Sequence, residues 1–287
     1  MKGTRIERID AFAYFNELKG RGFSTKEIIE KVRQKFSIPK GTLYCWAEGR
    51  NSPLGSIGKL ASTKELFYVL GAMLGDGCIY HWRNEHQVWL IGDEKFTKKF
   101  ANKLSVCIGR KVKNYKKRKR NYWFVKISNI QLYNLFHDIR RDLQKLTLMI
   151  EKGDYYENST EFIEGLFDAE GCVKIIKEKV RKTPKICLDI TNTNKAILDI
   201  ARLLLKSTLN IEAHYSIQKA DGIKNKQTAY HLRIYKKEYV KKFFETLDTT
   251  KLKPEKEQYL QNWLNYKNKG KIISPLPSDN SSQPASN

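Results

Sequence analysis

Two stretches of this sequence carry the same pattern, a mostly apolar run that ends in one acidic residue followed by Gly and Cys. The first is Val-Leu-Gly-Ala-Met-Leu-Gly-Asp-Gly-Cys at 69–78, and the second is Phe-Ile-Glu-Gly-Leu-Phe-Asp-Ala-Glu-Gly-Cys at 162–172. When Gly71 is aligned with Gly165, the acids Asp76 and Glu170 each fall five positions later. This internal repeat predicts a chain with two similar halves.

Small residues recur within each run at the spacing of one helical turn. If the runs are helices, Gly71 and Gly75 lie on one face, and so do Gly165 and Ala169. Small residues on a helix face let two backbones approach closely. We therefore predict that these four residues form the contact between the two helices.

Both helices carry residues typical of helix ends. The starts show two possible capping boxes and the ends show two glycines: Ser62 with Glu65, Asn158 with Glu161, then Gly77 and Gly171. A carboxylate in the last turn opposes the helix dipole, at a typical cost of ~0.3–1 kcal/mol, and two such carboxylates brought together also repel each other. We therefore expect a cation between the two acids.

The two motifs, at 69–77 and 163–171, resemble those of the LAGLIDADG homing endonucleases. The resemblance implies an α+β chain with two pseudo-symmetric αββαββα halves, whose antiparallel sheets form a DNA-binding saddle and whose motif helices pack side by side. A pair of core helices with incidental acids is the alternative. The halves are expected at 56–152 and 153–268, after a small helical domain at 1–55 and before a disordered tail at 269–287.

The resemblance also implies a metal site. Asp76 and Glu170 would bind Mg²⁺, or alternatively Mn²⁺, together with the backbone carbonyls of Gly75 and Ala169. Hydrolysis of an anionic phosphodiester needs charge neutralised on the phosphate and an activated water, and bound Mg²⁺ supplies both. Two acids at the end of a close helix pair can each address one strand across a minor groove only ~6 Å wide.

The charge balance favours a polyanionic partner. Lys and Arg number 54 against 31 Asp and Glu, which gives a formal net charge of +23. A membrane surface would also attract this charge, but no apolar run approaches the length of a spanning helix. The start lacks the apolar stretch of a signal peptide, so we expect a cytoplasmic or organellar protein. Five cysteines without a Cys-x-x-Cys pair indicate neither a disulfide framework nor a zinc site.

Residues 5–50 predict three short helices, with Pro39 in the first turn of the third and Leu43 and Trp46 facing inward. The pattern resembles a helix-turn-helix unit, although an inert capping bundle fits it as well. The net charge favours contact with DNA. The residues expected to make that contact are Lys40, Thr42, Tyr44 and Arg50.

The rest of each half predicts strand pairs and helices in one order. In the first half we expect strands at 78–82 and 87–91, a helix around 96–108, a hairpin of 112–115 with 122–127, and a helix at 130–139. In the second half we expect strands at 173–176 and 186–191, a helix at 196–205, a hairpin of 212–217 with 229–235, and helices at 239–247 and 254–266. The same order in both halves supports the repeat.

Basic groups are expected beside the phosphates. Lys126 and Arg233 occupy equivalent places, each near the end of a strand that precedes a helix. The family commonly has Lys there, so Arg233 departs from its pattern, and an Arg rarely gives up a proton. Asn192 is a predicted water-positioning group after the second strand of its half, where Asp93 stands in the first half. An exposed charge at a strand end is the plainer interpretation of both basic residues.

Two sheets twisted into a saddle would lie along the major groove with alternate residues facing DNA. The expected DNA contacts are Tyr80, Trp82, Arg83, Gln87, the basic turn Lys116, Lys117, Arg118, Lys119 and Arg120, and Lys174, Lys177, Arg181, Lys185 and Gln218. The basic turn alone is also typical of a solvated loop.

The leading hypothesis is a monomeric, metal-dependent endonuclease that cuts both strands of DNA at a long, near-asymmetric site. It would take no small-molecule substrate and would not act at a membrane. A DNA-binding regulator that does not cut, or an intron RNA maturase, fits the same scaffold.

Overall fold

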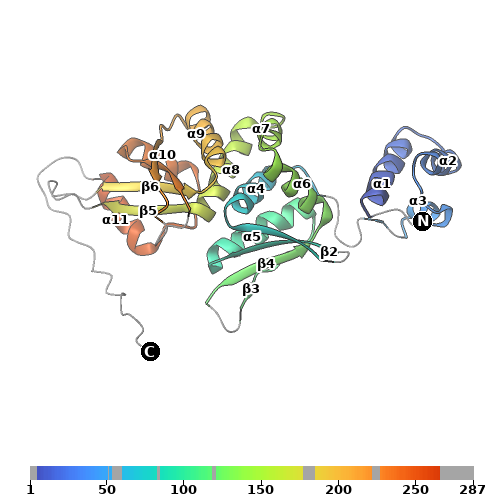
Figure 1. Ribbon diagram of the computed structural model, residues 1–287, viewed down its shortest axis with the longest axis horizontal. Coiled ribbons are helices and arrows are strands. Elements are labelled where there is room, and N and C mark those ends of the chain that lie inside the picture. The colour runs from blue at the N-terminus through green and yellow to red at the C-terminus, as the bar shows by residue number, and fades with distance from the viewer. Residues whose placement is uncertain are drawn as a thin grey trace, which may run out of the picture. The chain divides into compact units, whose positions relative to one another are not determined.

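A computed structural model describes residues 5–50, 52–53, 60–82, 85–117, 121–176, 185–221 and 227–265 (Figure 1). The predicted tail, most of the predicted linker and six expected DNA contacts lie outside these residues: Arg83, Arg118, Lys119, Arg120, Lys177 and Arg181. The chain divides into two compact units. One comprises Met1–Lys59 with Ile108–Arg110, and the other comprises Leu60–Cys107 with Lys111–Asn287. The predicted second half lies in the second unit, and most of the predicted first half lies there too.

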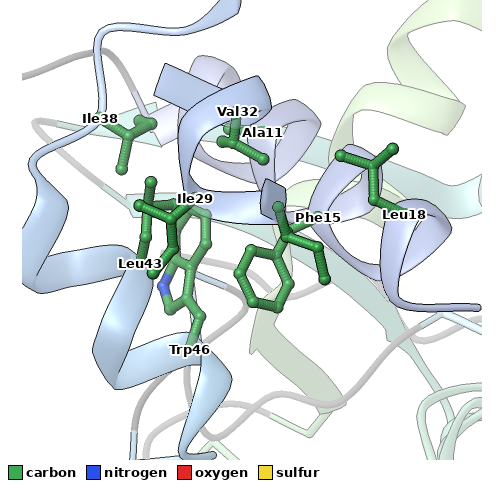
Figure 2. Close-up of a cluster of buried hydrophobic side chains, with 9 residues drawn as sticks. Ala11, Phe15, Leu18, Ile29, Val32, Ile38, Leu43 and Trp46 are labelled. Atoms are coloured by element: carbon green, nitrogen blue, oxygen red, sulfur yellow. The ribbon is translucent and has the colours of Figure 1, made fainter. Parts of the chain in front are cut away.

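The N-terminal unit contains the three predicted helices, α1 (Arg5–Gly20), α2 (Thr25–Lys35) and α3 (Lys40–Ala47). Ser24 and Glu27 form a capping box at the start of α2, and Pro39 lies directly before α3 rather than inside its first turn. The side chains that face inward form one apolar cluster: Ala11, Phe15, Leu18, Ile28, Ile29, Val32, Ile38, Leu43 and Trp46 (Figure 2). This cluster is the core that holds the three helices together.

The two motif runs are helices, α4 (Lys64–Asp76) and α8 (Tyr155–Glu170), and they pack against each other. Each ends at the predicted glycine, Gly77 or Gly171. The predicted starts are wrong in both cases. Thr63 precedes α4 and makes no capping bond with its side chain. Helix α8 begins earlier than expected, because Asp154 accepts a hydrogen bond from the Glu157 N–H at 2.9 Å.

Asn158, predicted as the cap of α8, lies inside the helix instead. Its side chain is buried, and its Nδ2 donates to the Ile150 carbonyl at 3.2 Å. A buried amide needs such a partner, and the end of the preceding helix supplies one. Asn158 therefore joins α8 to the helix before it and does not cap it.

The two sheets have the same strand order, which confirms the repeat. The first sheet runs β1-β2-β4-β3 and the second runs β5-β6-β8-β7, with all pairs antiparallel. The strands of the first sheet are β1 (Gly77–Trp82), β2 (Glu85–Gly92), β3 (Tyr115–Lys116) and β4 (Trp123–Ser128). Those of the second are β5 (Gly171–Ile176), β6 (Lys185–Asn192), β7 (His214–Gln218) and β8 (Ala229–Ile234).

Strand β3 is shorter than the sequence predicts. The predicted strand begins at Val112. The Val112 N–H does not pair with β4 but donates to Ser105 Oγ at 2.9 Å. Helix α7 (Gln144–Glu151) was not predicted, because it is short and follows the end of α6 (Ile130–Arg141) after only two residues. The remaining helices are α5 (Glu94–Ile108), α6 (Ile130–Arg141), α9 (Lys195–Leu209), α10 (Lys237–Thr246) and α11 (Pro254–Asn265). The predicted α+β class is confirmed.

Each sheet has one face covered by helices, and the apolar strand residues lie on that face. On β2 and β4 the buried alternate residues are Val88, Leu90, Val125 and Ile127. On β6 and β8 they are Leu188, Ile190, Leu232 and Ile234. Successive strand residues point to opposite sides of a sheet. The strand residues that alternate with these buried ones therefore form the other face of each sheet, called here the open face.

Candidate functional site: the paired motif acids

Backbone contact brings α4 and α8 together. A Cβ atom on Gly71 would collide with the Phe162 carbonyl oxygen, and one on Gly165 would collide with that of Tyr68. Near the helix ends, a Cβ on Gly75 would lie 2.5 Å from the Ala169 Cβ. Glycine is therefore required at these positions, since any side chain would push the helices apart. The close contact extends to the residues that directly precede the two acids.

Asp76 and Glu170 are the last residues of these helices. Removal of water from around the side chain, together with the nearby Asp76 charge, raises the pKa of Glu170 to about 7. Partial burial also raises the pKa of Asp76. The ammonium group of Lys251 lowers the pKa of both acids and so opposes these effects. The two carboxylates are thus close enough to repel each other, as the aligned motifs predict.

Lys251 is a site residue that the sequence did not reveal. It lies between α10 and α11, and its Nζ donates to the Ala169 carbonyl at 2.9 Å. The repulsion between the acids predicts a cation at this place. Its identity was not predictable, because no local pattern indicates that the connection after α10 returns to the end of α8.

Asn192 contacts one of the acids. Its Nδ2 donates to Glu170 Oε1 at 3.1 Å, and its Oδ1 accepts from the Asn194 N–H at 2.8 Å. Both bonds together fix the orientation of the amide beside the carboxylate. The amide is therefore held against the Glu170 carboxylate.

The expected pairing of Asn192 with Asp93 is wrong. Gly77 pairs with Leu90 and Gly171 with Ile190, so the residue equivalent to Asn192 is Gly92. Asp93 instead accepts a hydrogen bond from the Phe96 N–H at 2.9 Å, at the start of α5. A Cβ at position 92 would lie 2.6 Å from the Phe96 ring. The first half therefore has no side chain where the second half has Asn192.

Lys126 and Arg233 occupy equivalent positions in the two sheets, as predicted. Lys126 pairs across the sheet with Trp89 and then Cys78, and Arg233 pairs with Asp189 and then Cys172. The surroundings differ. Lys126 is exposed, with its Nζ 4.7 Å from the centre of the Trp89 ring.

Arg233 is held by a buried acid. Its Nε donates to Asp189 Oδ2 at 3.3 Å. The same carboxylate also contacts the Lys174 ammonium, and it lies 3.2 Å from His231 Nδ1. An ion pair of this kind partly neutralises the guanidinium, so the equivalent groups of the two halves differ in available charge.

Several expected DNA contacts share the open faces. In the first sheet Tyr80 pairs with Gln87, on the same side as Trp89 and Lys126. Gln87 is largely buried there and accepts from Trp89 Nε1 at 2.9 Å. Trp82 belongs to the same strand, but only its backbone is described. In the second sheet, strand alternation places Lys174, Lys185 and Gln218 on the face that carries Arg233.

The basic turn is described only in part. Lys116 pairs with Trp123, so alternation directs it away from the face that carries Lys126. Lys117 is exposed at the end of β3.

In the N-terminal unit, Lys40, Tyr44 and Arg50 are exposed and Thr42 is half-buried. Lys40 Nζ lies 5.9 Å from the centre of the Tyr44 ring, and Arg50 forms an ion pair with Glu48. These four residues thus differ in how freely they can meet a ligand, because Thr42 is half-buried and Arg50 is paired with an acid.

The donor set at the helix ends suits a hard divalent cation. The predicted set is two carboxylates and two backbone carbonyls, of which the Ala169 carbonyl here accepts from Lys251, and Mg²⁺ prefers oxygen ligands. Burial and, secondly, the Asp76 charge raise the pKa of Glu170, and the repulsion between the two acids is relieved when a cation lies between them. Across the described ranges, His, Cys, Asp and Glu side chains do not gather in threes as a metal site built from side chains alone would require.

The described helices include none with the length and apolar character needed to cross a membrane.

Comparisons with known proteins find a similarity to a described domain over part of the chain. Residues 157–248 match the family model of the LAGLIDADG-like domain. Mesophilic variants of the homing endonuclease I-DmoI are 24% identical, over 66% of this chain and 97% of theirs, with a TM-score of 0.47. I-DmoI in complex with DNA and Mn is 22% identical, over 66% of this chain and 99% of its own, with a TM-score of 0.47.

The N-terminal LAGLIDADG domain of DUF199/WhiA is 15% identical, over 67% of this chain and 87% of its own, with a TM-score of 0.43. None of the curated proteins compared with the chain matches it.

Proposed function

We propose that this protein, whose residues 157–248 match the model of the LAGLIDADG-like domain, is a site-specific, divalent-metal-dependent endonuclease that cuts both strands of duplex DNA. The observation that carries the proposal is the meeting of Asp76 and Glu170 at the ends of two helices in backbone contact. Two acids held close together repel each other and destabilise a fold, so their juxtaposition favours a functional role.

The residues that would hold the metal are Asp76 and Glu170, with the carbonyl of Gly75 and, once Lys251 has moved, that of Ala169. A bound divalent ion supplies charge neutralisation at the phosphate and lowers the pKa of a bound water. Asn192 positions a polar group beside Glu170, and Lys126 and Arg233 offer positive charge on the open faces. Each half would serve one strand.

The open faces are suited to a DNA duplex. Basic and amide side chains project from both sheets, and the chain has a net charge of +23. Lysines and arginines would mostly neutralise phosphates, while Gln218 offers an amide that can read base edges. The helical N-terminal unit would add contacts through Lys40 and Tyr44 as a second DNA-binding element.

A second candidate function is binding of DNA without cutting. It is favoured by one observation, that Lys251 donates to the Ala169 carbonyl that a metal would use. The two functions are separated by a plasmid that carries the protein's own insertion junction. The endonuclease linearises this plasmid with Mg²⁺ or Mn²⁺, and excess chelator stops the reaction. Cutting that persists in chelator would contradict a metal mechanism, and tight binding without cutting would support the second candidate.

A further inference from the structure

The connection between α10 and α11 is fixed along the side of α8 by consecutive hydrogen bonds. The Asp248 N–H donates to Glu164 Oε2 at 2.9 Å. Thr249 Oγ1 and the Thr250 N–H both donate to Asp168 Oδ1 at 2.7 Å. Asp168 is fully buried, so its bonds are shielded from water and strongly held. The segment therefore has one defined path, and that path ends beside the paired acids.

Lys251 is the next residue on this path. Its ammonium donates to the Ala169 carbonyl at 2.9 Å, in the last turn of α8, where unpaired carbonyls carry partial negative charge. Its positive charge also lowers the pKa of Asp76 and of Glu170, against the effect of their burial. Two carboxylates and one ammonium leave the cluster with a formal charge of −1 when both acids are ionised. The protein's own chain thus supplies a cation where two acids meet.

We infer that the Lys251 ammonium is the resident counter-ion of Asp76 and Glu170, and that a divalent cation must compete with it for this site. This inference rests on the proposed function, in which the two acids bind metal. Competition follows from charge and from a shared ligand. The ammonium repels an incoming cation, and it holds the Ala169 carbonyl that would complete the set of oxygen donors.

The inference predicts opposite effects of one substitution on metal affinity and on metal-free stability. Lys251→Met keeps a long unbranched side chain but removes the charge. Without the ammonium, Mn²⁺ meets an acid pair whose negative charge is not offset, together with a free carbonyl. We expect the Mn²⁺ dissociation constant to fall about tenfold, the size of effect that one charge produces in a partly buried site. The metal-free protein should unfold at a lower temperature, because the acids then repel without compensation.

Lys256 provides a matched control. Its Nζ donates to the Val173 carbonyl at 2.8 Å, so it makes the same kind of bond from the same C-terminal region. The charge of Lys256 is not among those that shift the pKa of either acid. Lys256→Met should therefore leave Mn²⁺ affinity unchanged. Lys251→Gln separates charge from hydrogen bonding, because the glutamine amide can still donate to the Ala169 carbonyl. This variant also replaces Lys251→Met in the test if Lys251→Met fails to fold.

The test is titration calorimetry with Mn²⁺ on the full chain without DNA, for wild type, Lys251→Met, Lys251→Gln and Lys256→Met. Tighter binding in both Lys251 variants, with wild-type binding in the Lys256 variant, is the expected result. Unchanged or weaker binding in the Lys251 variants, or an equal gain in the Lys256 variant, overturns the inference.

A second measurement separates this inference from the proposed function. Thermal unfolding without metal is compared for Lys251→Met, Asp76→Asn and the double variant. A counter-ion role predicts that Lys251→Met destabilises the wild type more than it destabilises the Asp76→Asn variant. If the wild type binds no Mn²⁺ but this coupling is present, metal-dependent function and competition fail while the counter-ion role holds. If Mn²⁺ binds but the coupling is absent, the counter-ion role is overturned and the proposed function stands.

Discussion

Arg233 in the second sheet donates from its Nε to the buried Asp189 carboxylate at 3.3 Å. Its counterpart in the first sheet, Lys126, has Trp89 in place of that acid. The two halves therefore repeat each other in strand order and register but not in charge. An enzyme built from them should treat its two DNA strands unequally.

Unequal basic groups predict unequal strand cutting. We expect Lys126→Met to slow one cut by about 100-fold, as loss of a charge-stabilising group at a reacting centre typically does. Arg233→Met should have a smaller effect on the other cut, because Asp189 already offsets part of its charge. Nicked plasmid should accumulate in both variants. Lys152→Met, which removes an exposed lysine at the end of α7, is the control, and equal effects of all three substitutions would contradict a catalytic role.

The helix contact predicts a strong response to one added methyl group. Gly165→Ala places its Cβ against the Tyr68 carbonyl oxygen, so α4 and α8 must separate. We expect a loss of about 1–3 kcal/mol or more in the free energy of unfolding.

Gly41→Ala is the control, because nothing lies within 4 Å of a Cβ at this helical glycine. It should stabilise its helix slightly, since Ala has a better helix propensity than Gly. Thermal unfolding checks both variants. A Gly165→Ala protein as stable as wild type would rule out the close helix contact.

The Glu170 carboxyl predicts a pH dependence of stability in the metal-free protein. Its pKa is raised from 4.5 to about 7, so the folded state binds this proton more tightly than the unfolded state does. The resulting stability is present below the unfolded value and is lost as pH rises through about 7.

Glu170→Gln removes this loss, because its side chain stays neutral. We expect the variant to melt at a higher temperature than wild type above neutral pH and to differ little in acid. Melting curves across that range, with chelator present, measure the difference. The same difference at every pH would show that the carboxyl does not titrate as its surroundings indicate.

The N-terminal unit predicts a separable contribution to binding. Lys40→Ala should weaken DNA binding and reduce the slope of log affinity against log salt by about one, as expected when one phosphate contact is lost. Cutting at saturating protein should be unchanged, since this unit carries none of the metal ligands. Lys31→Ala on α2 is the matched surface control. Identical salt slopes for Lys40→Ala and wild type would remove Lys40 from the interface.

Most of the fold could be predicted from the sequence, because the patterns that indicate helices and strands are local. Alternating strands and apolar helix faces are encoded within a few residues, and the aligned motifs located Asp76 and Glu170. The failures involve long-range partners. The Ile150 carbonyl drew Asn158 into α8, Phe96 occupies the space beside Gly92, and Lys251 reaches the acids along a path fixed by buried Asp168. Such partners depend on the finished tertiary structure, which no local pattern predicts.

Asp76 and Glu170 form the metal-dependent cutting site in the proposed function. Asp76→Asn and Glu170→Gln keep the size and hydrogen-bonding capacity of the side chains while removing the charge that binds metal. The close helix ends favour a metal shared between the acids, so each single substitution should strongly reduce both cuts, with some residual nicking compatible with the unequal halves. DNA binding, measured alongside, should survive in every variant.

The most direct measurement follows supercoiled, nicked and linear plasmid carrying the insertion junction, with Mg²⁺, for wild type and the double variant Asp76→Asn/Glu170→Gln. We predict that wild type yields linear DNA and that the double variant binds the plasmid but leaves it supercoiled. Full linearisation by the double variant would show that Asp76 and Glu170 are not the cutting site.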